Sequence, residues 1–206
     1  GVYADAYGIE VDGDLASFAN SGTVTANGTS TLAIDAIATG DDGATVALDN
    51  EVGGESFGVI IDSLDGPFTN SAAITSTNSA DLKIVADAGA ADVAPGMIVS
   101  SSFVKADAWG VVIDDFDGSF TNAKDGKITA DASATSSIDL AATGATAAAS
   151  DGVAVADTIT MANAIGVSLS GGEDTEEDPD TNVVTNAGSI SATAKATSTV
   201  TASGTS

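Results

Sequence analysis

The feature that most constrains this chain is an internal repeat of about 50 residues that occurs four times. Each copy contains a glycine followed by β-branched residues, and successive glycines are 50, 52 and 56 residues apart. Self-similarity at a fixed period is typical of repeat architectures, in which each unit buries its apolar face only against its neighbours. The chain is therefore expected to fold as a serial stack. The four glycines are Gly8, Gly58, Gly110 and Gly166.

One domain spanning 1–206 is predicted, with repeat cores at 7–26, 57–76, 109–130 and 165–192. The fourth core is interrupted by an acidic insert at 171–181, which is expected to protrude as a loop because like charges repel each other. Three columns of equivalent residues follow from the alignment. They are Tyr7, Phe57, Trp109 and Ile165; Phe18, Phe68 and Phe120; and Asn20, Asn70, Asn122 and Asn186.

The segments of each repeat have strand patterns. Stretches such as GVVID and GKITA alternate β-branched with other residues, and so do the later stretches 31–38, 81–88 and 137–143. A fourth set contains ATVALD, GMIVSS and GVAVADT. The Gly, Thr and Ser content opposes helix. The prediction is an all-β parallel β-helix, or β-solenoid, built from four repeats of about 50 residues with four sets of strands.

Each repeat could form one wide coil or two coils of about 25 residues, and the commoner size favours two. Equivalent positions of successive coils lie about 4.8 Å apart, so like side chains stack on like. The asparagine column is expected to form an amide ladder at one turn, and the Phe18 column an aromatic stripe inside the solenoid or at a corner. Tyr7 and Trp109 are likewise expected in the core or at a corner.

The composition limits how wide the core can be and which classes of partner the chain can bind. Hydrophobic residues make up 43% of the chain but aromatic residues only 4%, so the side chains can fill only a narrow interior. Five Lys+Arg residues stand against 30 Asp+Glu, a net charge of -25, which excludes nucleic acid and anionic membranes as partners because both require clustered basic residues. The sequence contains no run of 18 or more apolar residues, so no membrane-spanning segment is predicted.

Enzymatic activity is not expected. The chain has no cysteine and no histidine, and it lacks a GxSxG motif, so nucleophilic catalysis has no support. A lyase would need a basic residue of a kind that is missing, since all five cations are lysines. A glycosidase needs only two carboxylates. The acidic residues here recur in every repeat, however, whereas a catalytic pair should break the repeat.

Acidic turns are the one candidate for a cofactor, which would be Ca²⁺. Asp/Gly turns supply the oxygen ligands that this cation prefers, although no segment matches the EF-hand loop. The alternative is that these turns are solvated and keep a repetitive protein soluble. A sequon at Asn27 is either a glycan acceptor or a tight turn. The candidate calcium ligands are Asp12, Asp14, Asp62, Asp65, Asp114 and Asp117.

The pattern Phe-x-Asn-x-Gly-x-Ile-x-Ala, together with the Gly-Ile/Val strand starts and the Ala/Thr/Ser-rich strands, resembles the repetitive passenger regions of bacterial autotransporters and related surface adhesins. The resemblance covers essentially the whole chain. It implies a parallel β-solenoid at the cell surface that serves as a stalk, adhesin or fibre. No catalytic residues of that group map onto this sequence. An extracellular location is therefore expected.

The two ends of the chain are out of phase with its repeat. The opening YADAYGI matches KADAWGV at 105–111, and the closing stretch 189–204 matches 23–40. The chain is either a window of a longer repetitive protein or a subunit that stacks head to tail with copies of itself. Both alternatives predict a surface filament. A different hypothesis is an adhesin module that binds a glycan or a receptor through the loop at 171–181 and the faces of the repeats.

Overall fold

The computed structural model describes residues 1–40, 43–89, 94–145, 151–171 and 182–205, so the predicted acidic insert lies outside the described residues from 172 onward. The described residues contain strands and no helix, and hence no helix that could cross a membrane. The strands are β1 (Val2–Tyr3), β2 (Ala6–Leu15), β3 (Phe18–Asn20), β4 (Val24–Ala38), β5 (Thr45–Asp65), β6 (Phe68–Asn70), β7 (Ala73–Ala88), β8 (Met97–Asp117), β9 (Ser119–Asn122), β10 (Lys127–Thr143), β11 (Val153–Gly171), β12 (Val183–Asn186) and β13 (Ser189–Thr205).

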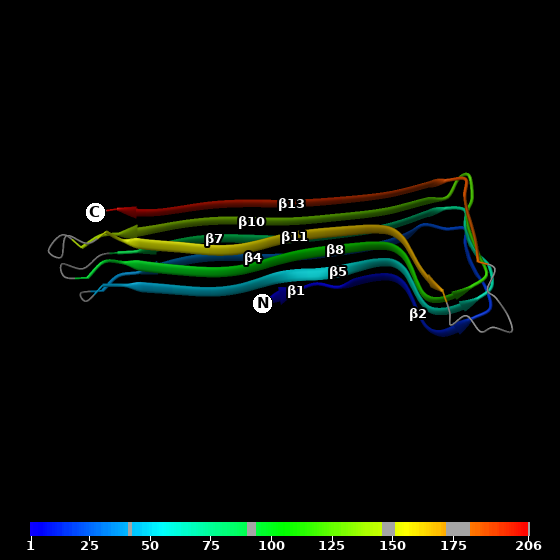
Figure 1. The fold of residues 1–206 in the computed structure, drawn as a ribbon, viewed down its shortest axis with the longest axis horizontal. Helices are drawn as coiled ribbons and strands as arrows, with labels where there is room; N and C mark the ends of the chain where they lie inside the picture. The colour runs from blue at the N-terminus through cyan, green and yellow to red at the C-terminus, as the bar shows by residue number, and fades with distance from the viewer. Residues whose placement is uncertain (41–42, 90–93, 146–150, 172–181, 206) are drawn as a thin grey trace.

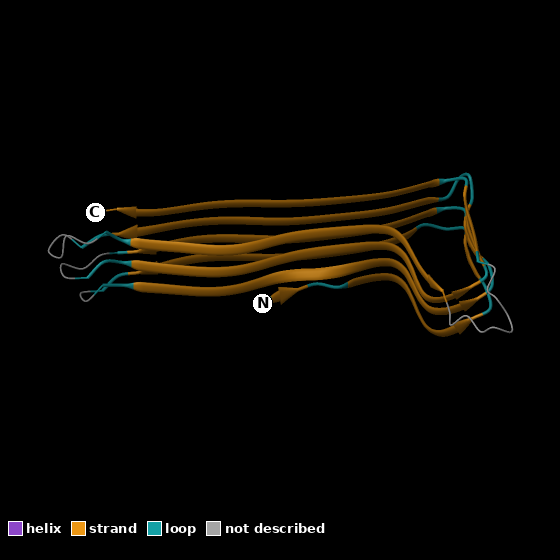
Figure 2. Cartoon of the chain, viewed as in Figure 1, coloured by secondary structure: helices purple, strands orange, loops and turns teal. Residues whose placement is uncertain are grey.

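The strands form three parallel sheets, which confirms the predicted all-β solenoid (Figures 1 and 2). Sheet A contains β1 and β2 beside β5, then β8 and β11. Sheet B contains the short strands β3, β6, β9 and β12. Sheet C contains β4, β7, β10 and β13. Each coil thus passes along a long strand of sheet A, turns through sheet B, and returns along sheet C.

Each repeat forms one wide coil, so the expectation of two coils of about 25 residues is wrong. The register shows this directly, because Ile128 of β10 pairs with Ile74 of β7 on one side and Ile190 of β13 on the other. A strand of 21 residues such as β5 is about 70 Å long, whereas four coils are only about 19 Å high. The coil is accordingly a flat slab whose long axis follows the strands (Figure 1).

The four predicted sets of strands merge into two long strands per coil, joined by a short one. GTVTA and TLAIDAIA both belong to β4, and ATVALD and the following GVIID both belong to β5. The predicted turn at Asn27 is also wrong, because Asn27 lies within β4. The long strands continue through their polar middle because serine hydroxyls there donate across the core. Ser76 Oγ lies 2.6 Å from the Ser56 carbonyl oxygen, and Ser30 Oγ 2.6 Å from that of Gly53.

Sheets A and C face each other over a thin core of small side chains. Along β7 and β10, alternate residues are buried and the intervening ones face solvent, as a sheet with one buried face requires. The buried positions are occupied mainly by alanine, serine, isoleucine and leucine, such as Ala80, Ile84 and Leu140. This is the narrow interior that the aromatic-poor composition predicted.

The glycine column lets sheet A pack close against sheet C. A Cβ atom on Gly58 would lie 2.6 Å from Ile74 Cγ2 and 2.5 Å from the Gly110 carbonyl oxygen. Toward their C-terminal ends, the strands of sheet A curve away from sheet C (Figure 1). Beyond the bend lies a second core cluster that contains the rings of Phe68, Phe116 and Phe120. The repeated glycine therefore has a packing role.

The asparagine and phenylalanine columns form continuous ladders in this cluster. Phe18 stacks on Phe68 with ring centroids 4.9 Å apart, and Phe68 stacks on Phe120 at 4.8 Å. The asparagine amides donate in series, Nδ2 to Oδ1, over 2.8–2.9 Å from Asn20 to Asn70, from Asn70 to Asn122, and from Asn122 to Asn186. These direct contacts are a consequence of having one coil per repeat.

Replacing Asn70 with alanine is expected to destabilise the chain by about 3 kcal/mol. Asn70 is fully buried, and its removal leaves the Asn20 amide hydrogens and the Asn122 carbonyl oxygen without their ladder partner. Each orphaned buried group costs about 1–3 kcal/mol. Urea unfolding measures the loss. A cost within error of that of Asn20→Ala, at the end of the ladder, would contradict this account.

Asn78→Ala, by contrast, is expected to stabilise the folded chain. The Asn78 side chain is fully buried in the middle of the slab, and neither its Nδ2 nor its Oδ1 has a hydrogen-bond partner among the described residues. Its register equivalents in the next two coils are Ala132 and Ala194. Because a buried unpaired amide costs about 1–3 kcal/mol, we expect the alanine variant to be about 1 kcal/mol more stable in the same urea assay. A loss of stability would show that the amide is bonded in solution.

The column that begins at Tyr7 lies on the outer face of sheet A next to the glycine column, so its expected place in the core is wrong. Tyr7 is 48% exposed. Its ring stacks on Phe57 at 5.4 Å, and Phe57 stacks on Trp109 at 6.1 Å. The neighbouring rings reduce the exposure of Phe57 to 9%. Stacking along the column thus shields apolar surface that the sequence pattern assigns to the interior.

Candidate functional site: the end faces of the solenoid

Two of the four coils are terminal, and their core-facing side chains lack a covering coil on one side. At the C-terminal end face, Ile190 and Val200 of β13 are 38% and 42% exposed. Their register partners one coil below, Ile128 and Ile138, are 0% and 1% exposed. Apolar β-branched residues at equivalent positions of the repeat are thus buried beneath a further coil and partly exposed at the end face.

The N-terminal end face repeats this pattern on the opposite side of the slab. Leu32 and Ile34 of β4 are only partly buried, whereas Leu82 and Ile84, their partners in β7, are 2% and 0% exposed. Phe18 at the bottom of the aromatic ladder is likewise only partly buried. Each end face therefore presents apolar side chains beside an unpaired strand edge, the combination that favours addition of a further strand.

The asparagine ladder gives the end faces opposite polarity. Every amide in the ladder donates toward the C-terminal coil, ending with Asn122 Nδ2 to Asn186 Oδ1 at 2.8 Å. A further coil stacked in the same direction would receive the Asn186 amide hydrogens on the Oδ1 atom of its own Asn20. That oxygen already accepts from the Gly22 N–H over 3.2 Å, and an amide oxygen has a second lone pair to offer. The ladder thus matches a donor face to an acceptor face.

The predicted calcium ligands are exposed and spread along the coil edge. Asp65 and Asp117 are register partners. Asp62 and Asp114 occupy equivalent positions, between the paired residues Ile61 and Ile113 and the paired residues Ser63 and Asp115. In β2 the register shifts between Val11 and Asp14, so Asp14 pairs with Ser63, while Asp12 falls in the irregular stretch next to Gly13, whose φ is 104°. Over the described ranges, no group of three or more acidic side chains could hold a metal ion. Calcium binding stays a prediction.

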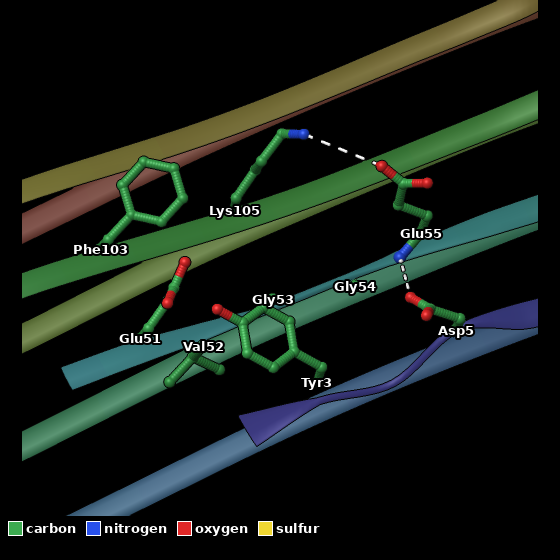
Figure 3. Close-up of a pocket in the computed structure, with 9 residues that line it drawn as sticks. All are labelled: Tyr3, Asp5, Glu51, Val52, Gly53, Gly54, Glu55, Phe103 and Lys105. Atoms are coloured by element: carbon green, nitrogen blue, oxygen red, sulfur yellow. Dashed lines mark hydrogen bonds and ion pairs between the residues drawn. The ribbon is translucent and has the colours of Figure 1, made fainter. Parts of the chain in front are cut away.

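A hollow of about 340 Å³ lies on the outer face of sheet A (Figure 3). Its register column reads Tyr3, Gly53 and Lys105, so the hollow opens where glycine contributes no side chain. The rings of Tyr3 and Phe103 form part of its wall. Sequence reasoning did not find this feature, although the Gly53-Gly54 pair interrupts the alternation of β5 and was an available signal.

Charged groups line the same hollow. Lys105 Nζ lies 2.5 Å from Asp107 Oδ2 and 3.9 Å from Glu55 Oε1. The hydrogen bond to Asp107 is the main reason that the pKa of Lys105 is raised, although desolvation opposes it. A hydrogen bond to Glu51 is the main cause of the raised pKa of Tyr3. Lys105 therefore stays protonated at physiological pH, with its positive charge offset by Asp107 and Glu55. The hollow as a whole is aromatic and acidic.

A scan against protein-family models, a search of curated proteins and a search of solved structures each found no match to this chain. The functional argument consequently depends on the geometry of the end faces and of the hollow.

Proposed function

We propose that this chain is a non-enzymatic structural protein of an extracellular filament, in which solenoids stack head to tail through their end faces. The partner at each end face is a further coil of the same repeat, supplied by a second copy or by neighbouring repeats of a longer chain. The single observation that carries the proposal is the complementarity of the end faces. In a head-to-tail contact, the partly exposed apolar side chains of one end face would cover those of the other. The donor end of the asparagine ladder would meet its acceptor end.

Head-to-tail stacking is favoured over a symmetric contact by the direction of the ladder. Two C-terminal faces brought together would oppose amide hydrogens to amide hydrogens, with no acceptor between them. A head-to-tail contact is heterologous and does not close on itself, so it produces a filament. The extracellular location follows from the resemblance to surface adhesins and is part of the proposal.

Electron microscopy of the purified chain tests the assembly. Stacked slabs would grow perpendicular to their strands, so we expect filaments with a layer line near 4.8 Å and an axial repeat of about 19 Å, the height of four coils. Imaging with calcium and with a chelator tests the predicted cation in the same experiment. Monomeric particles alone, across a wide range of protein concentrations, would contradict self-assembly of this chain.

The hollow on sheet A favours a second candidate function, binding of a glycan by an adhesin module. Its volume suits a sugar-sized ligand, and aromatic rings beside a few polar groups are typical of such sites. A glycan array probed with the chain tests this function, with Phe103→Ala as the loss-of-binding variant. Val99→Ala is the control, since Val99 lies on the same strand outside the lining of the hollow. Equal binding by both variants would contradict this role.

A further inference from the structure

One group of side chains on the outer face of sheet A departs from the repeat. Lys105 of β8 is the only lysine in the strands of sheet A, and its register partners are Gly53 and Met161. Asn163 of β11 is the only asparagine on the outer face of these strands, and its register partner is Asp107. A structural column recurs from coil to coil, whereas a set of groups that reacts together is expected once.

The Asp107 carboxylate contacts both of the other groups. Its Oδ2 atom lies 2.5 Å from Lys105 Nζ, and its Oδ1 atom accepts a hydrogen bond of 2.8 Å from Asn163 Nδ2. The Asp107 side chain is only 4% exposed, so its two partners rather than solvent surround the carboxylate. An amine and an amide are therefore held on the two oxygens of one carboxylate.

The lysine side chain is long enough to reach the asparagine. Because Lys105 pairs with Met161, Lys105 and Asn163 are diagonal neighbours on adjacent parallel strands. Their backbones are about 8 Å apart, given a strand spacing of about 4.8 Å and a rise of about 3.3 Å per residue. Long side chains span such diagonal pairs. The Lys105 side chain extends along the strand direction toward Glu55, and hence toward residue 163 of β11 (Figure 3).

We propose that Lys105 and Asn163 form an intramolecular isopeptide bond, with Asp107 as the proton carrier. The neutral Lys105 amine attacks Asn163 Cγ, a bond from Nζ to Cγ forms, and the bond from Cγ to Nδ2 breaks. Asp107 takes a proton from Nζ and passes a proton to Nδ2 along the hydrogen bond that already joins them. One ammonium group and one primary amide thus give one secondary amide and one ammonium ion. Atoms and charge balance, and no other reactant is consumed.

The bond would join β8 covalently to β11, and so one coil to the next. It would close a loop between residues 105 and 163, which removes conformations from the unfolded chain and favours the folded one. The reaction takes place within a single chain. The inference therefore goes beyond the proposed assembly and does not depend on it.

The protonation of Lys105 sets the rate of the reaction. Only the neutral amine attacks, and the raised pKa of Lys105 keeps that form scarce at neutral pH. The ionisable groups that face the amine are Asp107 of β8 and Glu55 of β5, whereas β11 contributes the uncharged Met161 and Asn163. Bond formation is expected to be slow at neutral pH and at least about tenfold faster at about pH 9, where the neutral fraction of a lysine is larger.

Intact-mass spectrometry of the full chain tests the bond, after incubation of the folded protein at about pH 9. The bonded chain should weigh about 17 Da less than its sequence, because ammonia leaves. Peptide fragmentation should find Lys105 joined to Asn163. A mass equal to that of the sequence after days of incubation would overturn the inference. A loss of about 18 Da, the mass of water, would place the bond on a carboxylate and would overturn it as well.

The matched variants are Lys105→Arg and Lys83→Arg. Lys105→Arg keeps the positive charge but removes the nucleophile, so its mass should stay that of its own sequence. Lys83 lies in β7 of sheet C, so Lys83→Arg should lose ammonia as the unmodified chain does. Loss of ammonia from Lys105→Arg would assign the change to a side reaction of an asparagine and overturn the bond.

Asp107→Ala tests the proton carrier. Removing a general acid–base group that contacts both nitrogens should slow the loss of ammonia at least about tenfold at the same pH. Circular dichroism checks that the variant is folded. An undiminished rate in the folded variant would overturn the role of Asp107.

Discussion

Gly58→Val is expected to destabilise the folded chain by more than about 3 kcal/mol, at the upper end of the cost of overpacking a core. A Cβ atom at this position would lie 2.5 Å from the Gly110 carbonyl oxygen and 2.6 Å from Ile74 Cγ2. The first contact is with backbone and the second with a fully buried side chain, so neither neighbour can move without disturbing the coil above or the facing sheet. The cause is lack of space, because the conformation of Gly58 is open to any residue.

The measurement is urea unfolding of Gly58→Val beside Gly22→Val. No atom lies within 4 Å of the Cβ position at Gly22, so the control should change the free energy of unfolding by less than about 0.5 kcal/mol. The Gly58 variant should also lose cooperativity, because the column of glycines runs through every coil. Comparable stability of the two variants would show that the sheets can separate at the bend.

Val200→Asp is expected to abolish filament formation while leaving the individual chain folded. Val200 occupies a core-facing position of β13 but is 42% exposed at the C-terminal end face. The carboxylate introduced by the substitution can therefore stay hydrated in the single chain. Stacking would bury that carboxylate at the position equivalent to Ile138, which is 1% exposed. Burying an unpaired charge costs several kcal/mol or more, enough to prevent association.

Thr199→Asp is the matched control for charge. It places the same carboxylate one residue away on β13, on the outer face of sheet C, beside Ser137 of the neighbouring strand and the position of Ala33 in a stacked copy. Electron microscopy and sedimentation velocity should show filaments for Thr199→Asp and dispersed chains for Val200→Asp. Filaments of normal length from Val200→Asp would mean that assembly uses a surface other than the end face.

The repeat itself determined the class of fold and the columns of like residues. Equivalent residues at a constant spacing must lie on equivalent positions of successive coils, so the Asn20 and Phe18 columns could be named before any coordinates were known. The period-2 patterns identified strands because side chains alternate between the two faces of a sheet. These inferences depend on local or repeated information, which the sequence contains in full.

The cross-section of the coil was decided by tertiary structure. The polar residues at 27–30 and 77–79 are equally compatible with a turn and with the middle of a strand. The serine hydroxyls favour the strand, because in the folded chain they bond to the opposite sheet, as Ser30 does to Gly53. That partner is 23 residues away, and no local pattern indicates it. The number of coils per repeat depends on the same contacts.

Tertiary structure likewise decided which surfaces are left open. Leu32 and Leu82 are the same residue in the same repeat position, and only the presence of a neighbouring coil makes one partly buried and the other 2% exposed. The hollow above Gly53 depends on where one coil lies against the next. The sequence alone therefore determined what each coil is made of, and the packing of coil on coil decided where the chain can bind another molecule.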